Sequence, residues 1–231
     1  MNLRSVPVTG VWRDGSGTVE VRNLGLAALY AFGGRPSGVA DVTFEFEGRR
    51  LTLLGFARIG DSEGVFVEQD WAWLPVVGRT VVDIGASLGD SPAYFALRGA
   101  GKVLAYEANP DALDLLKQNI ALNSLRNVEP RPAVANLGDA ANGAPEGDLV
   151  AKIDCEGCEY PLLEQTPDAD LRRYSHLMFE YHYGPERLKT RLKASGYRVW
   201  YTRPRTPSGP NGRPAPDRPA MVAGLLWARR T

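Results

Sequence analysis

Apolar and polar positions along this chain alternate between strand-like and helix-like segments. Short apolar runs rich in β-branched residues are separated by segments whose apolar residues recur at helical spacing. This order is typical of a parallel sheet whose strands are connected by helices. We therefore predict strands at 81–83, 103–107, 128–136, 149–154, 174–182, 197–203 and 221–229, and helices at 91–98, 110–123 and 186–196.

The first 60 residues have a different pattern, in which strand-like segments are joined by turn residues such as Asp14-Gly15 and Gly48-Arg49. We expect them to form a small β-rich N-terminal cap, and residues 61–231 to form the main domain. The predicted strands of this cap lie at 18–23, 41–48 and 50–56.

Ser62 is a suitable N-cap for a helix that continues to about Leu74 and ends before Pro75. Two tryptophans, Trp71 and Trp73, lie near its end. We expect them to pack in the core, and the alternative is that they line an acceptor pocket.

A glycine turn connects the first core strand of the main domain to its helix. Asp83 ends the strand, and Gly85 and Gly89 let the backbone turn tightly before the helix begins. The free N–H groups at a helix N-terminus, with the positive end of the dipole, can hold an anionic ligand group. Glu107 ends the next strand, 22 residues beyond Gly85, close to the spacing at which an acidic residue binds ribose hydroxyls. The pattern predicts a nucleoside-cofactor site.

Ser87 indicates which nucleoside cofactor fits this turn. A dinucleotide fingerprint has glycine at that position, where it lets the backbone approach a pyrophosphate. Residues 83–89 instead read Asp-x-Gly-x-x-x-Gly, which suits a nucleoside that carries an amino-acid carboxylate in place of phosphates. S-adenosylmethionine (AdoMet) meets this description, and a nicotinamide oxidoreductase is disfavoured.

Two segments, VVDIGASLGDSPAYFALRGAGKVLAYEANP (81–110) and VAKIDCEGCEYPLL (150–163), resemble the FkbM family of class I methyltransferases. The motif K-I-D-x-E-G-x-E in the second segment is the more specific, and Ala108 departs from the proline common in the family. The resemblance implies a Rossmann-like α/β fold with AdoMet as cofactor and a hydroxyl as methyl acceptor. It also implies a seven-stranded, mostly parallel sheet in the order 3-2-1-4-5-7-6, completed by a C-terminal antiparallel hairpin.

Polar residues at the carboxyl ends of the fourth and fifth core strands would face the methyl group and the acceptor. Lys152 and Asp154 share one strand face, as do Glu180 and His182. A carboxylate there can orient a hydroxyl, take its proton or hold a metal. The alternatives are that Glu180 only pairs with Lys152 and that His182 is a surface residue. We expect no metal at this site. Candidate catalytic residues are Lys152, Asp154, Glu180 and His182, and candidate cofactor-binding residues are Asp83, Gly85, Ala86, Ser87, Gly89, Asp90, Glu107, Ala108, Asn136 and Asp154.

Cys155 and Cys158 form a C-x-x-C pair and are the two cysteines of the chain. A zinc site would need two further ligands. We interpret the cysteines as small apolar fillers, and a local disulfide, as found in intracellular proteins of thermophiles, is the alternative.

The formal net charge is zero, but its distribution is uneven. From Arg187 to Thr231 there are eleven basic residues and one acidic residue, which gives this region a charge of +10. Such a region can bind an acidic partner such as RNA, or it can be a solvated surface paired with the acidic remainder. Arg205, Arg213 and Arg218 lie in a Pro- and Gly-rich loop expected beside the acceptor.

The sequence shows neither a signal-peptide pattern nor an apolar run of membrane-spanning length, so we expect a cytoplasmic protein without a membrane partner. The leading hypothesis is an AdoMet-dependent O-methyltransferase acting on a hydroxylated small molecule. A tRNA or rRNA methyltransferase and an AdoMet-binding protein without catalysis are the alternatives. The sequence does not indicate an oligomeric state.

Overall fold

The computed structural model describes residues 8–11, 18–21, 35–36, 41–56, 62–145, 147, 149–204 and 221–231. Within these residues, seven strands form one sheet in the order β11-β12-β10-β9-β6-β7-β8. The five strands from β8 to β10 are parallel, whereas β12 pairs antiparallel with both β10 and β11. The strands are β6 (Thr80–Ile84), β7 (Lys102–Tyr106), β8 (Val128–Arg131), β9 (Leu149–Ile153), β10 (Tyr174–Tyr181), β11 (Tyr197–Tyr201) and β12 (Gly224–Arg230). The predicted strand order and hairpin are confirmed.

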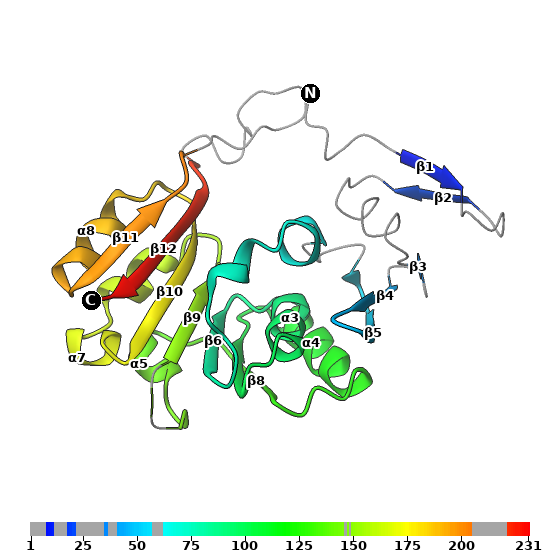
Figure 1. The fold of residues 1–231 in the computed structure, drawn as a ribbon, viewed down its shortest axis with the longest axis horizontal. Coiled ribbons are helices and arrows are strands. Elements are labelled where there is room, and N and C mark those ends of the chain that lie inside the picture. Colours follow the sequence, from blue (N-terminus) through cyan, green and yellow to red (C-terminus); the bar gives the residue numbers. More distant parts are fainter. Residues whose placement is uncertain are drawn as a thin grey trace.

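Helices cover both faces of this sheet, with α3 and α4 on one face and α5, α7 and α8 on the other (Figure 1). Successive residues of the central strands alternate between the two layers: Val81 packs with the first and Val82 with the second. The helices are α3 (Asp90–Leu97), α4 (Pro110–Leu122), α5 (Leu137–Ala140), α6 (Glu159–Glu164), α7 (Asp168–Leu171) and α8 (Glu186–Ala194). The short helices α5, α6 and α7 have too few turns to show a helical period, and the sequence pattern did not predict them.

Short strands occupy the described part of the N-terminal region, as expected. The strands β1 (Val8–Val11) and β2 (Thr18–Val21) form one sheet, and β3 (Arg35–Pro36), β4 (Val42–Phe46) and β5 (Arg49–Leu53) form another. The turn between β4 and β5 is at Glu47-Gly48, where φ is 48° and 69°, and Arg49 already belongs to β5. The turn expected at Asp14-Gly15 lies outside the described residues. The boundary near residue 60 stays a prediction.

The helix expected from Ser62 to Leu74 is not continuous. A π-helical segment, η2 (Ser62–Val67), is followed by a 3-10 helix, η3 (Asp70–Trp73). Gln69 separates them with φ of 52°, a left-handed conformation that cannot continue an α-helix. Phe66 and Trp71 are both buried, and we attribute the break to the need to turn both side chains toward the core.

Among the described residues, none of the helices is long and apolar enough to cross a membrane. The Pro- and Gly-rich loop with Arg205, Arg213 and Arg218 lies outside the described residues.

Candidate functional site

A cavity of about 520 Å³ lies at the carboxyl ends of β6, β7, β9 and β10. This is the edge at which open α/β sheets bind ligands. Eight of the predicted site residues line it: Gly85, Ser87, Asp90, Glu107, Ala108, Lys152, Asp154 and Glu180.

The glycine turn after β6 forms the floor of the cavity because its backbone packs closely against the neighbouring strand ends. Gly85 has φ of 77°, and a Cβ atom there would lie 1.7 Å from the backbone oxygen of Asp154. The N–H groups of Gly85 and Ala86 both donate to the carbonyl of Tyr106, at 3.0 and 2.9 Å. Only glycine fits at position 85.

Glu107 stands at the cavity wall, where it holds two backbone groups. Its Oε2 accepts the N–H of Ser87 at 2.8 Å, and its Oε1 accepts the N–H of Asn109 at 2.7 Å. A carboxylate has about four acceptor positions, so Glu107 can fix both loops and still accept ligand hydroxyls. Asn109 caps α4 through hydrogen bonds from the N–H groups of Asp111 and Ala112.

A buried ion pair lies beneath the turn. Lys152 Nζ lies 3.2 Å from Asp83 Oδ1 and donates to the carbonyl of Gly85 at 2.6 Å. Burial lowers the pKa of Lys152, but the charges of Asp83 and Asp154 raise it by more, so that its pKa lies above the ordinary value. The raised pKa favours the charged form of Lys152, which is suited to stabilising the turn.

Asp154, Glu180 and His182 converge beside the cavity, and a ligating atom from each lies within 4.8 Å of the others. His182 is buried rather than at the surface. Its Nδ1 lies 3.0 Å from Oε1 of the fully buried Glu159. Burial lowers the pKa of His182, but its hydrogen bond to Glu159 and the surrounding carboxylates raise it to about 9.

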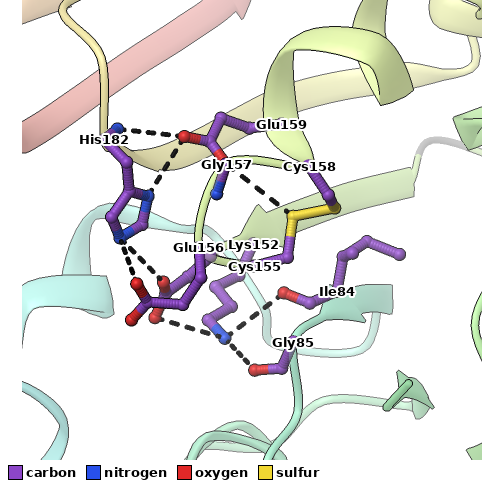
Figure 2. Close-up of a disulfide and its surroundings, with 10 residues drawn as sticks. Ile84, Gly85, Lys152, Cys155, Glu156, Gly157, Cys158, Glu159 and His182 are labelled. Carbon is purple, nitrogen blue, oxygen red and sulfur yellow. Dashed lines mark hydrogen bonds and ion pairs between the residues drawn. A yellow bond between two sulfur atoms is a disulfide. The ribbon is translucent and has the colours of Figure 1, made fainter. Parts of the chain in front are cut away.

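Cys155 and Cys158 form a disulfide. Interpreting them as simple apolar fillers was therefore wrong, although both also pack against the core. Figure 2 shows that the disulfide lies within the loop that carries Glu156 and leads to Glu159, and that the Glu159 carboxylate contacts His182. The cross-link restrains the loop between β9 and α6, which lines the cavity.

The remaining predicted residues lie outside the cavity lining. Asp83 at the end of β6 and Ala86 and Gly89 within the turn are buried, and Asn136 caps α5 by accepting the N–H of Asp139 at 2.9 Å. The cavity lining also contains residues for which the sequence pattern predicted no role in a site: Tyr106, Ala133, Val134, Cys155, Glu156 and Cys158. It contains Trp71 as well, for which lining a pocket was the alternative prediction. Trp71 is both buried in the core and part of the wall, whereas Trp73 is exposed.

Several basic residues of the C-terminal region are paired with acidic ones. Arg187 lies 2.6 Å from Glu164, and Arg191 lies 2.6 Å from Asp168. Lys189 is paired with Glu186 of the same helix. These pairs support the interpretation of α8 as a solvated surface.

No family model matches the chain. The chain is 30% identical to the uncharacterized protein 158B of Sulfolobus islandicus rod-shaped virus 1 over 90 residues. This alignment covers 38% of this chain and 54% of the relative. The chain is 34% identical to the uncharacterized protein 65 of Sulfolobus islandicus filamentous virus over 89 residues, 38% of this chain and 52% of the relative. The chain thus spans about half the length of these relatives.

Among solved structures, the chain is similar to the tRNA m1G37 methyltransferase of M. jannaschii, with a TM-score of 0.55 and 17% identity over 85% of this chain and 59% of that one. It is also similar to Trm5b from Pyrococcus abyssi, with a TM-score of 0.52 and 18% identity over 99% and 64% of the two chains. At these low sequence identities, the similarity to both structures shows a shared fold and nothing more. The chain has the Rossmann-like fold of class I, AdoMet-dependent methyltransferases.

Proposed function

We propose that this protein binds AdoMet in the cavity at the end of β6 and transfers its methyl group to a hydroxyl of a small molecule. The glycine turn would hold the amino-acid end, and Glu107 would accept hydrogen bonds from the ribose. Asp154, Glu180 and His182 would lie at the methyl and acceptor end. A cytoplasmic location belongs to the same proposal.

The charge of the cavity is the observation that carries the proposal. Five carboxylates line it, from Asp90, Glu107, Asp154, Glu156 and Glu180, against the single ammonium of Lys152 among its described lining residues. This surplus of negative charge suits a cationic ligand and repels a pyrophosphate. AdoMet carries a sulfonium and an ammonium against one carboxylate, and a cavity of about 520 Å³ lies within the usual range for such ligands.

AdoMet supplies a methyl group whose transfer forms a C–O bond, breaks the C–S bond and leaves S-adenosylhomocysteine and the proton of the hydroxyl. The residues of the chain have to place the hydroxyl and remove that proton. Asp154 is suited to orienting it, since this carboxylate follows β9 at the cavity and is one quarter exposed. Lys152 Nζ lies 3.8 Å from Asp154 Oδ2 and forms an ion pair with this carboxylate.

The proposal that the acceptor is a hydroxyl rests on the resemblance of the K-I-D-x-E-G-x-E motif to that of FkbM proteins. Methylation of tRNA or rRNA is the alternative, and it would draw on the basic C-terminal region. The acidic residues at the acceptor end, Glu156 and Glu180, disfavour the approach of a phosphate backbone. The ion pairs of Arg187 and Arg191 also reduce the charge that α8 can offer.

Calorimetric titration of AdoMet and S-adenosylhomocysteine tests the cofactor site. We expect micromolar binding that Glu107→Gln weakens about tenfold to hundredfold, because a hydrogen bond to a charged group contributes about 1.5–3 kcal/mol. Glu129→Gln is the matched control, since Glu129 lies on the neighbouring strand outside the cavity lining. Absence of binding, or equal loss in both variants, would refute the site.

Transfer of a radiolabelled methyl group then tests the acceptor. We expect hydroxylated metabolites to be labelled, at a rate that does not change with salt concentration. Labelling of RNA with a steep salt dependence would instead identify the alternative, and AdoMet binding without any transfer would indicate a cofactor-binding protein.

A further inference from the structure

We propose that Asp154, Glu180 and His182 bind one divalent metal ion beside the cofactor cavity. This replaces the expectation from sequence of a site without metal. The occupation of the metal site is independent of the function proposed above; its role in the reaction rests on that function.

The backbone brings the three side chains to one point. Asp154 follows β9, and Glu180 and His182 lie at the end of β10, the parallel neighbour of β9 in the sheet. One ligand atom from each residue lies within 4.8 Å of the other two. Metal bonds to imidazole nitrogen and carboxylate oxygen are about 2.0–2.2 Å long. Asp154 and Glu180 are only partly buried, so small rotations of their side chains would close this geometry around an ion.

The setting of His182 is an independent observation that points to a metal. Its Nδ1 and backbone N–H both meet Oε1 of Glu159, at 3.0 and 2.9 Å, and Glu159 Oε2 accepts the N–H of Gly157 at 2.8 Å (Figure 2). A histidine that binds a metal usually donates its other ring N–H to a carboxylate in this way, which fixes the ring and its tautomer. Glu159 thereby directs Nε2 toward the cluster.

Nε2 is surrounded by carboxylates that lie beyond hydrogen-bonding distance. It is 4.0 Å from Asp154 Oδ1 and 3.7 Å from Glu156 Oε2. Lys152 lies on the other side of Asp154 and already pairs with Asp83. A divalent ion would take the place of the Nε2 proton and neutralise the concentrated negative charge.

The ligand set indicates the kind of ion. Imidazole with two carboxylates favours Mn²⁺, Fe²⁺, Co²⁺ or Zn²⁺, whereas Mg²⁺ and Ca²⁺ prefer oxygen ligands alone. Three protein ligands leave coordination positions for water and for the acceptor oxygen. An ion there lowers the pKa of a bound hydroxyl, and the released proton can pass to Glu156, whose side chain is 62% exposed, and then to water.

Binding of Mn²⁺ to the chelator-treated full-length protein, followed by electron paramagnetic resonance, tests the proposal. We expect one bound ion with a nitrogen coupling from His182. Glu180→Gln is expected to weaken Mn²⁺ binding at least about tenfold, and Glu159→Gln, which loses the carboxylate behind His182, about ten- to hundredfold. Far-ultraviolet circular dichroism of each variant verifies that it is folded.

Glu107→Gln is the control in the same cavity: it should lose AdoMet affinity and keep Mn²⁺ affinity, while Glu180→Gln should lose far more affinity for Mn²⁺ than for AdoMet. This separates failure of the metal site from failure of the cofactor site. No Mn²⁺ bound at millimolar concentration, an ion without nitrogen coupling, or equal affinity in wild type and Glu180→Gln would overturn the proposal.

Discussion

Lys152 shows how one buried side chain can support the turn of a candidate binding site. Its ammonium lies beneath the glycine turn, bonded to the carbonyl of Gly85 and paired with the fully buried Asp83. Burial raises the pKa of Asp83, and Lys152 counteracts this rise only in part. Removing one partner of such a buried pair leaves an uncompensated charge.

We predict that Lys152→Met destabilises the protein by about 3–5 kcal/mol near neutral pH. The pKa of Asp83 in the folded state, already above its ordinary 3.8, rises further in the variant. As the pH rises, the unfolded chain loses this proton at a lower pH than the folded chain does. The free energy of unfolding therefore falls as the pH rises above about 4. Urea unfolding at several pH values checks this, and a deficit independent of pH would contradict it. Lys102→Met, which removes a partly exposed partner of Glu129, should change stability by less than about 1 kcal/mol.

Among the elements, α4 connects the N-terminal hairpin to the main sheet through two asparagines. Asn119 accepts the N–H of Leu54 at 2.8 Å and donates to the carbonyl of Leu88 at 2.9 Å. Asn123 accepts the N–H of Thr52 at 2.9 Å and donates to its carbonyl at 2.7 Å. These side-chain amides form hydrogen bonds with backbone groups of Thr52 in β5 and of Leu54 just after it. They take the place that a neighbouring strand would have.

We predict that Asn119→Ala lowers stability by about 2 kcal/mol or more, because it leaves a backbone donor and buried acceptors without partners. Hydrogen exchange should become faster in the hairpin formed by β4 and β5. Asn127→Ala, which removes a comparable hydrogen bond to the carbonyl of Ala100, should leave that hairpin unchanged. Unaltered protection of the hairpin in Asn119→Ala would show that apolar contacts alone hold it.

For the whole molecule, one hydrophobic cluster extends from the hairpin to the sheet. Phe44 packs edge-on against Phe66 at 4.9 Å, and the same cluster includes Tyr94 of α3, Leu116 of α4 and Trp71 at the cavity wall. The hairpin and the cofactor cavity therefore share a core, and we expect them to unfold together.

We predict that Phe44→Ala destabilises the protein by about 3–5 kcal/mol and that tryptophan fluorescence and far-ultraviolet circular dichroism still show coincident thermal transitions. The exposed Leu122 of α4 gives the control, Leu122→Ala, which should change little. Separate transitions in which the main sheet keeps its midpoint would indicate an independent N-terminal unit.

Local and periodic features were predictable from the sequence alone. The alternation of strand and helix patterns predicted the strands and helices, and the family resemblance added the strand order. Gly85 and Glu107 could be named as candidate cofactor residues because a tight turn and the spacing to a ribose-binding carboxylate are both properties of nearby positions along the chain.

The composition of the acceptor end, in contrast, depends on the tertiary structure. Glu159 was visible in the motif, but its pairing with His182, 23 residues away, follows from how α6 packs beside β10. The break at Gln69 is equally beyond local pattern, because burial of Phe66 and Trp71 depends on the packed core. For the cysteines, the C-x-x-C spacing allowed a local disulfide as the alternative, and the structure shows that this disulfide forms. The sequence by itself determined the fold class and the position of the cofactor turn, since these follow from periodicity and spacing along the chain. Only the tertiary structure decided which charges meet around His182, because contacts between separate elements depend on packing in three dimensions.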